Sequence, residues 1–124
     1  MNDSTADDGL DEFSIASNTL IGSLDNGEIT FFDLNPEDDG FSKRGIDCIR
    51  ADNAEHSAEV IISVLDGREG PAADIVILNA GAAIFLCGQC QSIHEGVEIA
   101  RKTVAQGAAK NRLQELVEYS RRCA

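Results

Sequence analysis

The sequence predicts a fold that begins with a β-hairpin and continues with about four helices. Asn26-Gly27 separates two β-prone runs, residues 19–24 and 28–34. Both residues of this dipeptide tolerate the positive φ of a tight turn, so it is a strong short-range signal for a hairpin. Beyond residue 52, apolar residues recur at helical spacing between residues that commonly begin and end helices.

The second predicted strand carries apolar side chains on both faces. Ile29 and Phe31 lie on one face, and Phe32 and Leu34 lie on the other, because side chains alternate along a strand. We therefore expect cover on both sides. Asn35-Pro36 ends the strand, since proline cannot donate a hydrogen bond to a ladder.

The first predicted helix begins at Asp52-Asn53-Ala54-Glu55. This sequence fits a capping box in which Asp52 accepts a hydrogen bond from the backbone N–H of Glu55 while Glu55 reaches back. Gly67 then supplies a stop. The apolar stripe of this helix consists of Ala54, Ala58, Ile61, Ile62 and Leu65.

The second predicted helix is the most apolar segment of the chain. It opens at Pro71, where the missing N–H costs nothing, and Asp74 suits the helix dipole. Residues 75–86 are apolar nearly all round, so this helix is expected to be buried on most sides. Asn79 is the polar exception and needs partners if buried; we expect it to tie helices together rather than contact a ligand.

Two further helices follow. Residues 92–95 form a second capping box, and the helix that they begin ends near Gly107. The last helix is expected from about Ala108 to Ser120. His94 falls in the first turn of the third helix, and we predict a surface residue without a role in a site.

The charge balance excludes two classes of partner. The chain has 22 acidic and 10 basic residues and a formal net charge of −12. A protein that binds nucleic acid or an anionic membrane needs basic patches on its surface, so neither is an expected partner of this chain. No apolar run is long enough to span a bilayer, and the polar start does not fit a signal peptide. We expect a cytoplasmic protein.

The cysteines do not predict a metal or redox site. Cys87 and Cys90 have C-x-x-C spacing, but no second such pair exists and His56 and His94 stand alone, so a zinc site lacks ligands. The pair follows an expected helix C-terminus, which does not stabilise a thiolate. We interpret these cysteines as ordinary cytosolic thiols.

The segment Asp8-Gly9-Leu10-Asp11-Glu12 is the candidate site. It places three carboxylates within five residues around one glycine. Mg²⁺ prefers oxygen ligands, and a bound Mg²⁺ can hold a phosphorylated substrate. The alternative interpretation is a solvated acidic leader, which also describes residues 1–7.

The order of several segments resembles a known enzyme family. These segments are Gly9-Leu10-Asp11-Glu12, Asn26-Gly27-Glu28-Ile29, Asn35-Pro36-Glu37-Asp38 with Gly40, Asp74-Ile75-Val76-Ile77-Leu78-Asn79-Ala80, Glu95-Gly96-Val97-Glu98-Ile99-Ala100 and Gly107-Ala108. Together they resemble the C-terminal portion of anthranilate phosphoribosyltransferases, which are glycosyltransferases of the nucleoside-phosphorylase-like family 3. The resemblance implies an α/β fold class, with residues 8–124 forming part of a phosphoribosyltransferase α/β domain after a leader of residues 1–7.

The resemblance also implies a function. Members of this family transfer phosphoribose from phosphoribosyl pyrophosphate to anthranilate in tryptophan biosynthesis and use Mg²⁺. By position, Asp11 and Glu12 are expected to bind Mg²⁺ on the pyrophosphate. The family's pyrophosphate loop and anthranilate-contacting residues lie upstream of the matching segments, so we expect an incomplete catalyst without catalytic residues of its own.

The expected partners follow from this incompleteness. They are phosphoribosyl pyrophosphate and anthranilate as substrates, and either a missing N-terminal half or a second copy of the chain. The alternative function is a non-enzymatic interaction or dimerisation module that reuses the fold, with an exposed apolar surface as its partner site. A metal-dependent enzyme of another kind is disfavoured, because no nucleophile or general base is identifiable.

Overall fold

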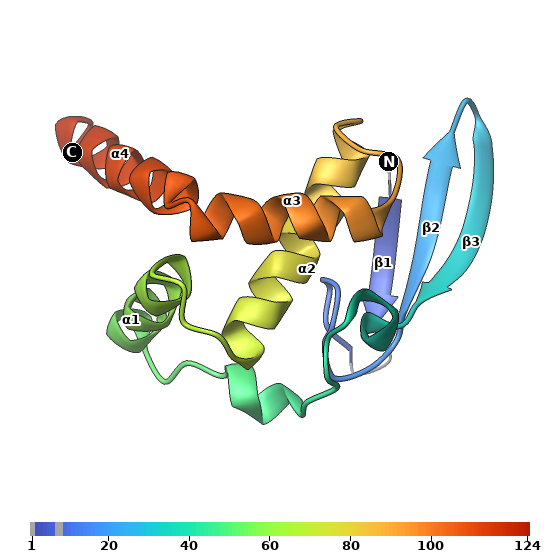
Figure 1. The fold of residues 1–124 in the computed structure, drawn as a ribbon, viewed down its shortest axis with the longest axis horizontal. Helices are drawn as coiled ribbons and strands as arrows, with labels where there is room; N and C mark the ends of the chain where they lie inside the picture. The colour runs from blue at the N-terminus through green and yellow to red at the C-terminus, as the bar shows by residue number, and fades with distance from the viewer. Residues whose placement is uncertain (1, 7–8) are drawn as a thin grey trace.

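The computed structural model describes residues 2–6 and 9–124 and confirms the predicted order of a hairpin followed by helices (Figure 1). Its strands are β1 (Asn2–Ala6), β2 (Thr19–Asp25) and β3 (Glu28–Leu34), followed by the 3₁₀ turns η1 (Pro36–Asp39) and η2 (Ile46–Ile49). Its helices are α1 (Ala54–Leu65), α2 (Pro71–Leu86), α3 (Ile93–Ala105) and α4 (Ala108–Arg122). In this part of the chain, no helix is both long and apolar enough to cross a membrane.

The hairpin forms where the Asn-Gly signal places it. β2 and β3 pair antiparallel along their whole length, with Asp25 opposite Glu28 at the turn. Asn26 and Gly27 both have positive φ, 49° and 84°, as the tight turn requires. Local turn chemistry therefore sets the register of the whole hairpin.

The start of the chain differs from the expected leader. Asn2–Ala6 pair antiparallel with β2, which gives a three-stranded sheet in the order β1-β2-β3. This polar segment lacks the apolar alternation that signals a strand, so its pairing with β2 rather than its own sequence makes it one. Met1 and Asp7, the other residues of the expected leader, lie outside the described residues.

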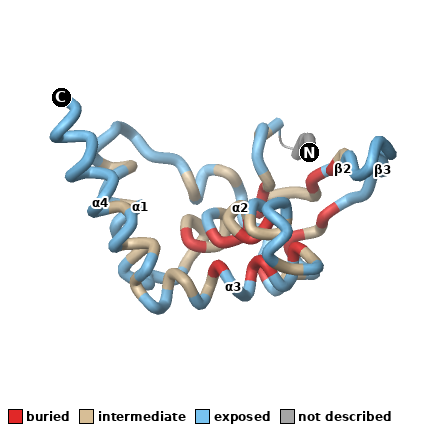
Figure 2. The backbone as a smooth tube through the Cα atoms, turned by 90° about the horizontal axis from the view of Figure 1, so that it is seen from above, coloured by how far each residue is buried: buried red, intermediate tan, exposed pale blue. Residues whose placement is uncertain are grey.

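The core lies where the sheet meets α2 and α3. In Figure 1 the sheet stands at one end, α2 and α3 cross beside it, and α1 and α4 lie at the opposite end. Ile21 of β2, Leu78 of α2 and Val97 of α3 are fully buried together. Figure 2 shows that buried residues concentrate around this crossing, whereas most of α1 and α4 is exposed.

Two glycines allow α2 and α3 to cross closely. A Cβ built on Gly96 would lie 2.1 Å from the carbonyl oxygen of Gly81, and one built on Gly81 would lie 2.6 Å from the backbone nitrogen of Val97. Both positions therefore require glycine. Gly81, which carries no side chain, therefore lets the backbone of α3 approach α2 closely.

The helix starts agree only in part with the predicted caps. Pro71 is the first residue of α2, and Ser92 caps α3 by accepting a hydrogen bond from the backbone N–H of Glu95. The cap predicted at Asp52 is wrong: Asn53 is the N-cap of α1, and its side chain accepts from the backbone N–H of His56. The helix starts one residue later than expected, so the asparagine takes the capping position.

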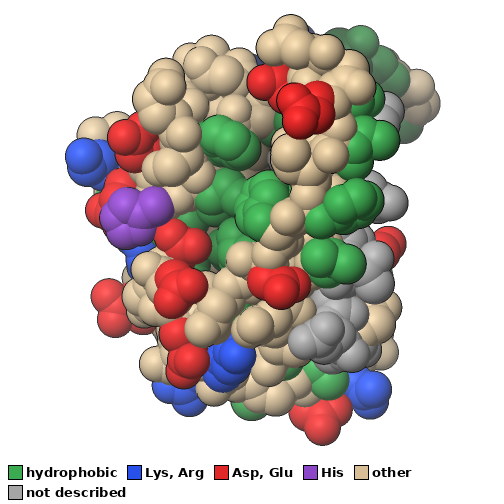
Figure 3. Space-filling model, turned by 90° about the vertical axis from the view of Figure 1, so that its right-hand side faces the viewer, with side chains coloured by type: hydrophobic (Ala, Val, Ile, Leu, Met, Phe, Trp, Pro, Cys, Tyr) green, Lys and Arg blue, Asp and Glu red, His purple; other side chains and the backbone are tan. Residues whose placement is uncertain are grey.

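One face of the hairpin is open in this structure. The inner face buries Ile21 in the core, but the expected cover of the other face is not found within residues 2–6 and 9–124. Figure 3 shows hydrophobic side chains reaching the surface on the side of the molecule that the sheet forms. The exposed apolar residues of the outer face are Leu20, Leu24, Ile29 and Phe31, with Ile29 at 62% and Phe31 at 71% exposure.

Candidate functional site

The acidic turn, which is the described part (residues 9–12) of the candidate segment, lies between β1 and the buried segment that leads into β2. Gly9 has a φ of 85°, a left-handed conformation that favours glycine. Asp11 and Glu12 follow at a bend, and both are exposed to solvent. Asp8, the third carboxylate of the predicted cluster, lies outside the described residues.

Asn79 of α2 is hydrogen-bonded to the backbone of Phe13, the residue that directly follows these carboxylates. Its Oδ1 accepts a hydrogen bond from the backbone N–H of Phe13 at 3.0 Å, and its Nδ2 donates to the carbonyl oxygen of Phe13 at 2.9 Å. Nδ2 also donates to the carbonyl oxygen of Ile75, one turn earlier in α2. Asn79 thus has the partners that we expected, but it ties α2 to the acidic turn and not to another helix.

The residues after Phe13 form a buried base for the turn. Ser14, Ile15 and Thr19 are almost completely buried. The hydroxyl of Thr19 accepts from the backbone N–H of Ser14 at 3.2 Å, and the hydroxyl of Ser14 accepts from the backbone N–H of Ala16 at 2.9 Å. Side-chain hydroxyls therefore satisfy backbone groups that no strand or helix satisfies.

The carboxylates of the acidic turn fit the protein's share of a magnesium site whose other ligands are substrate phosphates and water. Among the residues that the structure describes, no group of three or more His, Cys, Asp or Glu side chains is arranged to hold a metal. Mg²⁺ in phosphate-handling sites is commonly held by one or two carboxylates plus substrate phosphates and water. The exposed carboxylates of Asp11 and Glu12 match this requirement in ligand type and number.

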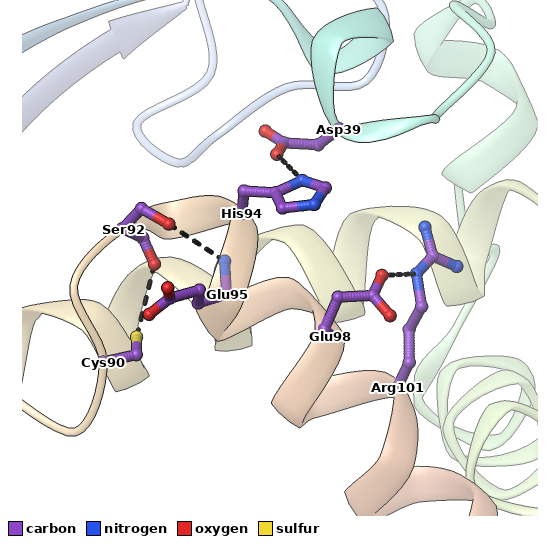
Figure 4. A network of polar contacts seen from close by, with 7 residues as sticks. All are labelled: Asp39, Cys90, Ser92, His94, Glu95, Glu98 and Arg101. Carbon is purple, nitrogen blue, oxygen red and sulfur yellow. Dashed lines mark hydrogen bonds and ion pairs between the residues drawn. The ribbon is translucent and has the colours of Figure 1, made fainter.

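His94 makes a long-range contact that the sequence did not reveal. Figure 4 shows its ring at the start of α3 facing Asp39 at the end of η1, with Nδ1 3.1 Å from Oδ1. The Asp39 side chain is only 10% exposed, whereas the His94 side chain is largely exposed. The pair joins α3 to the turn after β3, so His94 has a contact between elements rather than a purely solvated position.

The cysteines of the C-x-x-C pair are not joined by a disulfide in the structure. Cys87 is the C-cap residue of α2, as expected for a helix C-terminus, and both thiols of the pair are free. The thiol of Cys90 lies 3.3 Å from the carbonyl oxygen of Ser92 (Figure 4).

Asp74 is a carboxylate whose surroundings change its pKa. Burial in the first turn of α2 raises the pKa of Asp74, and the nearby guanidinium groups of Arg101 and Arg44 oppose that rise only in part. These groups line a cleft of about 620 Å³ between the end of α1, the start of α2 and α3. The arginines therefore act as counter-charges for a half-buried acid.

We predict that Asp74→Asn stabilises the chain slightly at neutral pH. Because its pKa is raised in the folded state, Asp74 favours folding below the ordinary aspartate pKa and loses this contribution as pH rises through the raised pKa. The amide resembles the neutral form and does not titrate. Urea unfolding should show a small gain at pH 7 that disappears below about pH 4.

The matched control is Asp47→Asn, which changes an acid whose side chain is 87% exposed. We expect no comparable pH-dependent gain there. A loss of stability for Asp74→Asn at pH 7 would mean that the arginine contacts outweigh burial.

Comparison with known proteins gives the class of this fold and site. A family model described as "Glycosyl transferase family, a/b domain" matches residues 4–110. The chain therefore belongs to this glycosyl transferase family. Within it, the chain corresponds to the C-terminal portion of the anthranilate phosphoribosyltransferases.

Two curated relatives carry this assignment. The anthranilate phosphoribosyltransferase of Thiobacillus denitrificans is 42% identical over 113 residues, which are 91% of this chain and 33% of that protein. The enzyme of Nitrosospira multiformis is 44% identical over 114 residues, 92% of this chain and 33% of that protein. The chain thus spans about a third of the length of the relatives it matches.

Solved structures show the same fold. The anthranilate phosphoribosyltransferase of Thermus thermophilus superposes with a TM-score of 0.84 at 28% identity, over 97% of this chain and 36% of that one. The Saccharomyces cerevisiae enzyme, solved in complex with PRPP and Mg, gives a TM-score of 0.85 over 94% of this chain and 34% of that one. Its identity of 21% establishes the shared fold alone.

Proposed function

We propose that this chain supplies the magnesium-binding half of a phosphoribosyltransferase site that transfers phosphoribose from phosphoribosyl pyrophosphate to anthranilate. The observation that carries the proposal is the exposed Asp11-Glu12 pair, held at a bend by the Asn79 attachment in a chain of this family. The chain spans a third of its relatives, so the proposal requires the other two thirds for catalysis.

The chemistry of the two carboxylates supports this role. Bound Mg²⁺ would neutralise charge that develops on the pyrophosphate leaving group. Asp11 and Glu12 supply hard oxygen ligands that remain accessible to solvent. The net charge of −12 repels an anionic substrate, so a cation between the carboxylates and the pyrophosphate removes an unfavourable interaction.

The names of the structural neighbours agree with these ligands. One Saccharomyces cerevisiae structure is described in complex with PRPP and Mg, and another in complex with 4-fluoroanthranilate. These ligands are those of the yeast enzyme. They support Mg²⁺, phosphoribosyl pyrophosphate and anthranilate as the proposed ligands of a complete site that includes this chain.

Complementation tests the proposal directly. We expect this chain, co-expressed with the N-terminal two thirds of the Nitrosospira multiformis enzyme, to restore phosphoribosyl transfer to anthranilate. Anthranilate fluorescence measures the reaction. The control chain carries Asp11→Asn and Glu12→Gln and should associate equally well without restoring activity. A folded, associated wild-type pair without activity would contradict the proposal.

The second candidate function is a non-enzymatic interaction or dimerisation module. The open hairpin face favours it, because Ile29 and Phe31 are mostly exposed and Leu20 and Leu24 lie beside them. This candidate predicts self-association of the isolated chain. Size-exclusion chromatography with light scattering measures it, and a stable monomer would argue against the module.

A further inference from the structure

We propose that Asn79 is a positioning residue, whose carboxamide fixes the acidic turn relative to the helical core and so sets the place of the magnesium ligands. The inference rests on the proposed function of Asp11 and Glu12. It deepens that function by assigning a role to a residue 66 positions away from Phe13 at the end of the turn.

The first argument is the number of bonds between Asn79 and one residue of the turn. The carboxamide accepts from the N–H and donates to the C=O of the same residue, Phe13, at 3.0 and 2.9 Å. Two antiparallel bonds fix the orientation of this backbone as well as its distance. The second amide proton bonds to the carbonyl of Ile75, so both protons of the side chain are used.

The second argument concerns the side-chain contacts of the two carboxylates themselves. Within residues 9–124, no hydrogen bond or ion pair of the Asp11 or Glu12 side chain is found, and both are exposed. Their location is therefore set by the backbone that carries them. Phe13 is the next residue after Glu12, so the Asn79 contact is one residue from the proposed ligands.

The third argument is that Asn79 itself is held rigidly. Its neighbour Leu78 is fully buried, and Gly81, half a turn on, contacts Gly96 of α3 at backbone distance. The ring of Phe13 also packs against the core cluster. A fixed helix position on one side and a short connection to the carboxylates on the other make Asn79 suitable for positioning.

No other side chain of this size reproduces the contact. Leucine has nearly the same shape but can form neither bond, and aspartate cannot donate to the Phe13 carbonyl. A polar residue in the otherwise apolar part of α2, residues 75–86, is costly to bury unless hydrogen bonds offset that cost. Asparagine at this position is therefore explained by its contact with the turn.

The test combines amide exchange with metal binding in the 124-residue chain. Asn79→Leu removes both bonds to Phe13, and Asn79→Ser keeps a polar group that is too short to form both. NMR measures hydrogen exchange of the Phe13 amide, and calorimetry measures Mg²⁺ binding with phosphoribosyl pyrophosphate. Ser63→Ala is the matched control, because it removes a side-chain bond to the carbonyl of Val60 within α1.

We expect faster Phe13 exchange in both Asn79 variants and an affinity for Mg²⁺ that falls about 10- to 100-fold, as found when supporting groups of metal ligands are removed. Exchange of Val97 and Ala100 in α3 should stay slow, which shows that the core remains folded. The Asn79→Ser variant provides this comparison if Asn79→Leu does not fold. The Ser63→Ala control should change neither Phe13 exchange nor affinity.

Different results separate the inference from the proposed function. Unchanged Phe13 exchange, or faster exchange with unchanged affinity, would overturn the positioning role. Lack of binding by the folded wild-type chain would instead overturn the proposed magnesium site.

Discussion

Replacing the two carboxylates of the acidic turn, Asp11→Asn with Glu12→Gln, is expected to abolish Mg²⁺-dependent binding of phosphoribosyl pyrophosphate. The amides keep the size of the side chains but cannot provide the anionic oxygen ligands that Mg²⁺ prefers. Supporting groups around a metal already change affinity by about 10- to 100-fold, so removal of both proposed ligands should cost more than about 100-fold. Calorimetric titration of Mg²⁺ and phosphoribosyl pyrophosphate into the chain measures the effect.

A matched control separates ligation from charge. Glu37→Gln with Asp38→Asn changes another adjacent pair of exposed carboxylates, so both double variants move the formal net charge from −12 to −10. We expect the control to bind like the wild type, or slightly better because the field is less repulsive. Equal losses in both variants would show that general electrostatics, rather than the acidic turn, attracts the cation.

Omission of the metal adds a second distinction. If Asp11 and Glu12 act through Mg²⁺, the wild type and the double variant should be equally poor at binding phosphoribosyl pyrophosphate without it. A difference that persists without Mg²⁺ would mean that the carboxylates contact the substrate or change the fold instead. Circular dichroism of both chains establishes that they are equally folded.

Features determined by neighbouring residues could be predicted from the sequence. Asn26-Gly27 predicted the hairpin because turn conformation depends on those two residues. Pro71 and Ser92 marked the starts of α2 and α3 for a similar reason, since caps satisfy backbone groups within one turn. Even here the prediction was accurate only to within one residue, as Asn53 and not Asp52 caps α1.

Features that depend on contacts between distant residues could not be predicted from the sequence. β1 has no strand pattern of its own and exists through its pairing with β2. The sequence indicated that Asn79 needed partners, but Phe13 lies 66 residues away, and periodicity carries no information about such a pair. The contact of His94 with Asp39, at a separation of 55 residues, was missed for the same reason. The acidic turn could be singled out from the sequence because its carboxylates are adjacent in the chain, and its role as a magnesium site stays a prediction.

The second large effect is expected at the crossing of α2 and α3, for Gly96→Ala. The added methyl would lie 2.1 Å from the carbonyl oxygen of Gly81, which is backbone and cannot move like a flexible side chain. The two helices must separate or shift to relieve this overlap, and overpacking of this kind costs about 3 kcal/mol. Such a loss is a large part of the stability of a small domain.

Gly45→Ala is the control for Gly96→Ala, because Gly45 has a φ of −61° and no atom within 4 Å of a built Cβ. Alanine is compatible with that backbone, so the control should be neutral or slightly stabilising. Urea unfolding followed by circular dichroism compares the two variants. Asn79, which accepts the hydrogen bond from the Phe13 amide, lies in α2 and would shift with that helix. Gly96→Ala should therefore also speed hydrogen exchange of the Phe13 amide, whereas Gly45→Ala should not. Equal stability of both variants would mean that α2 and α3 do not cross at backbone distance in solution, and the rigid support of the acidic turn would then need another origin.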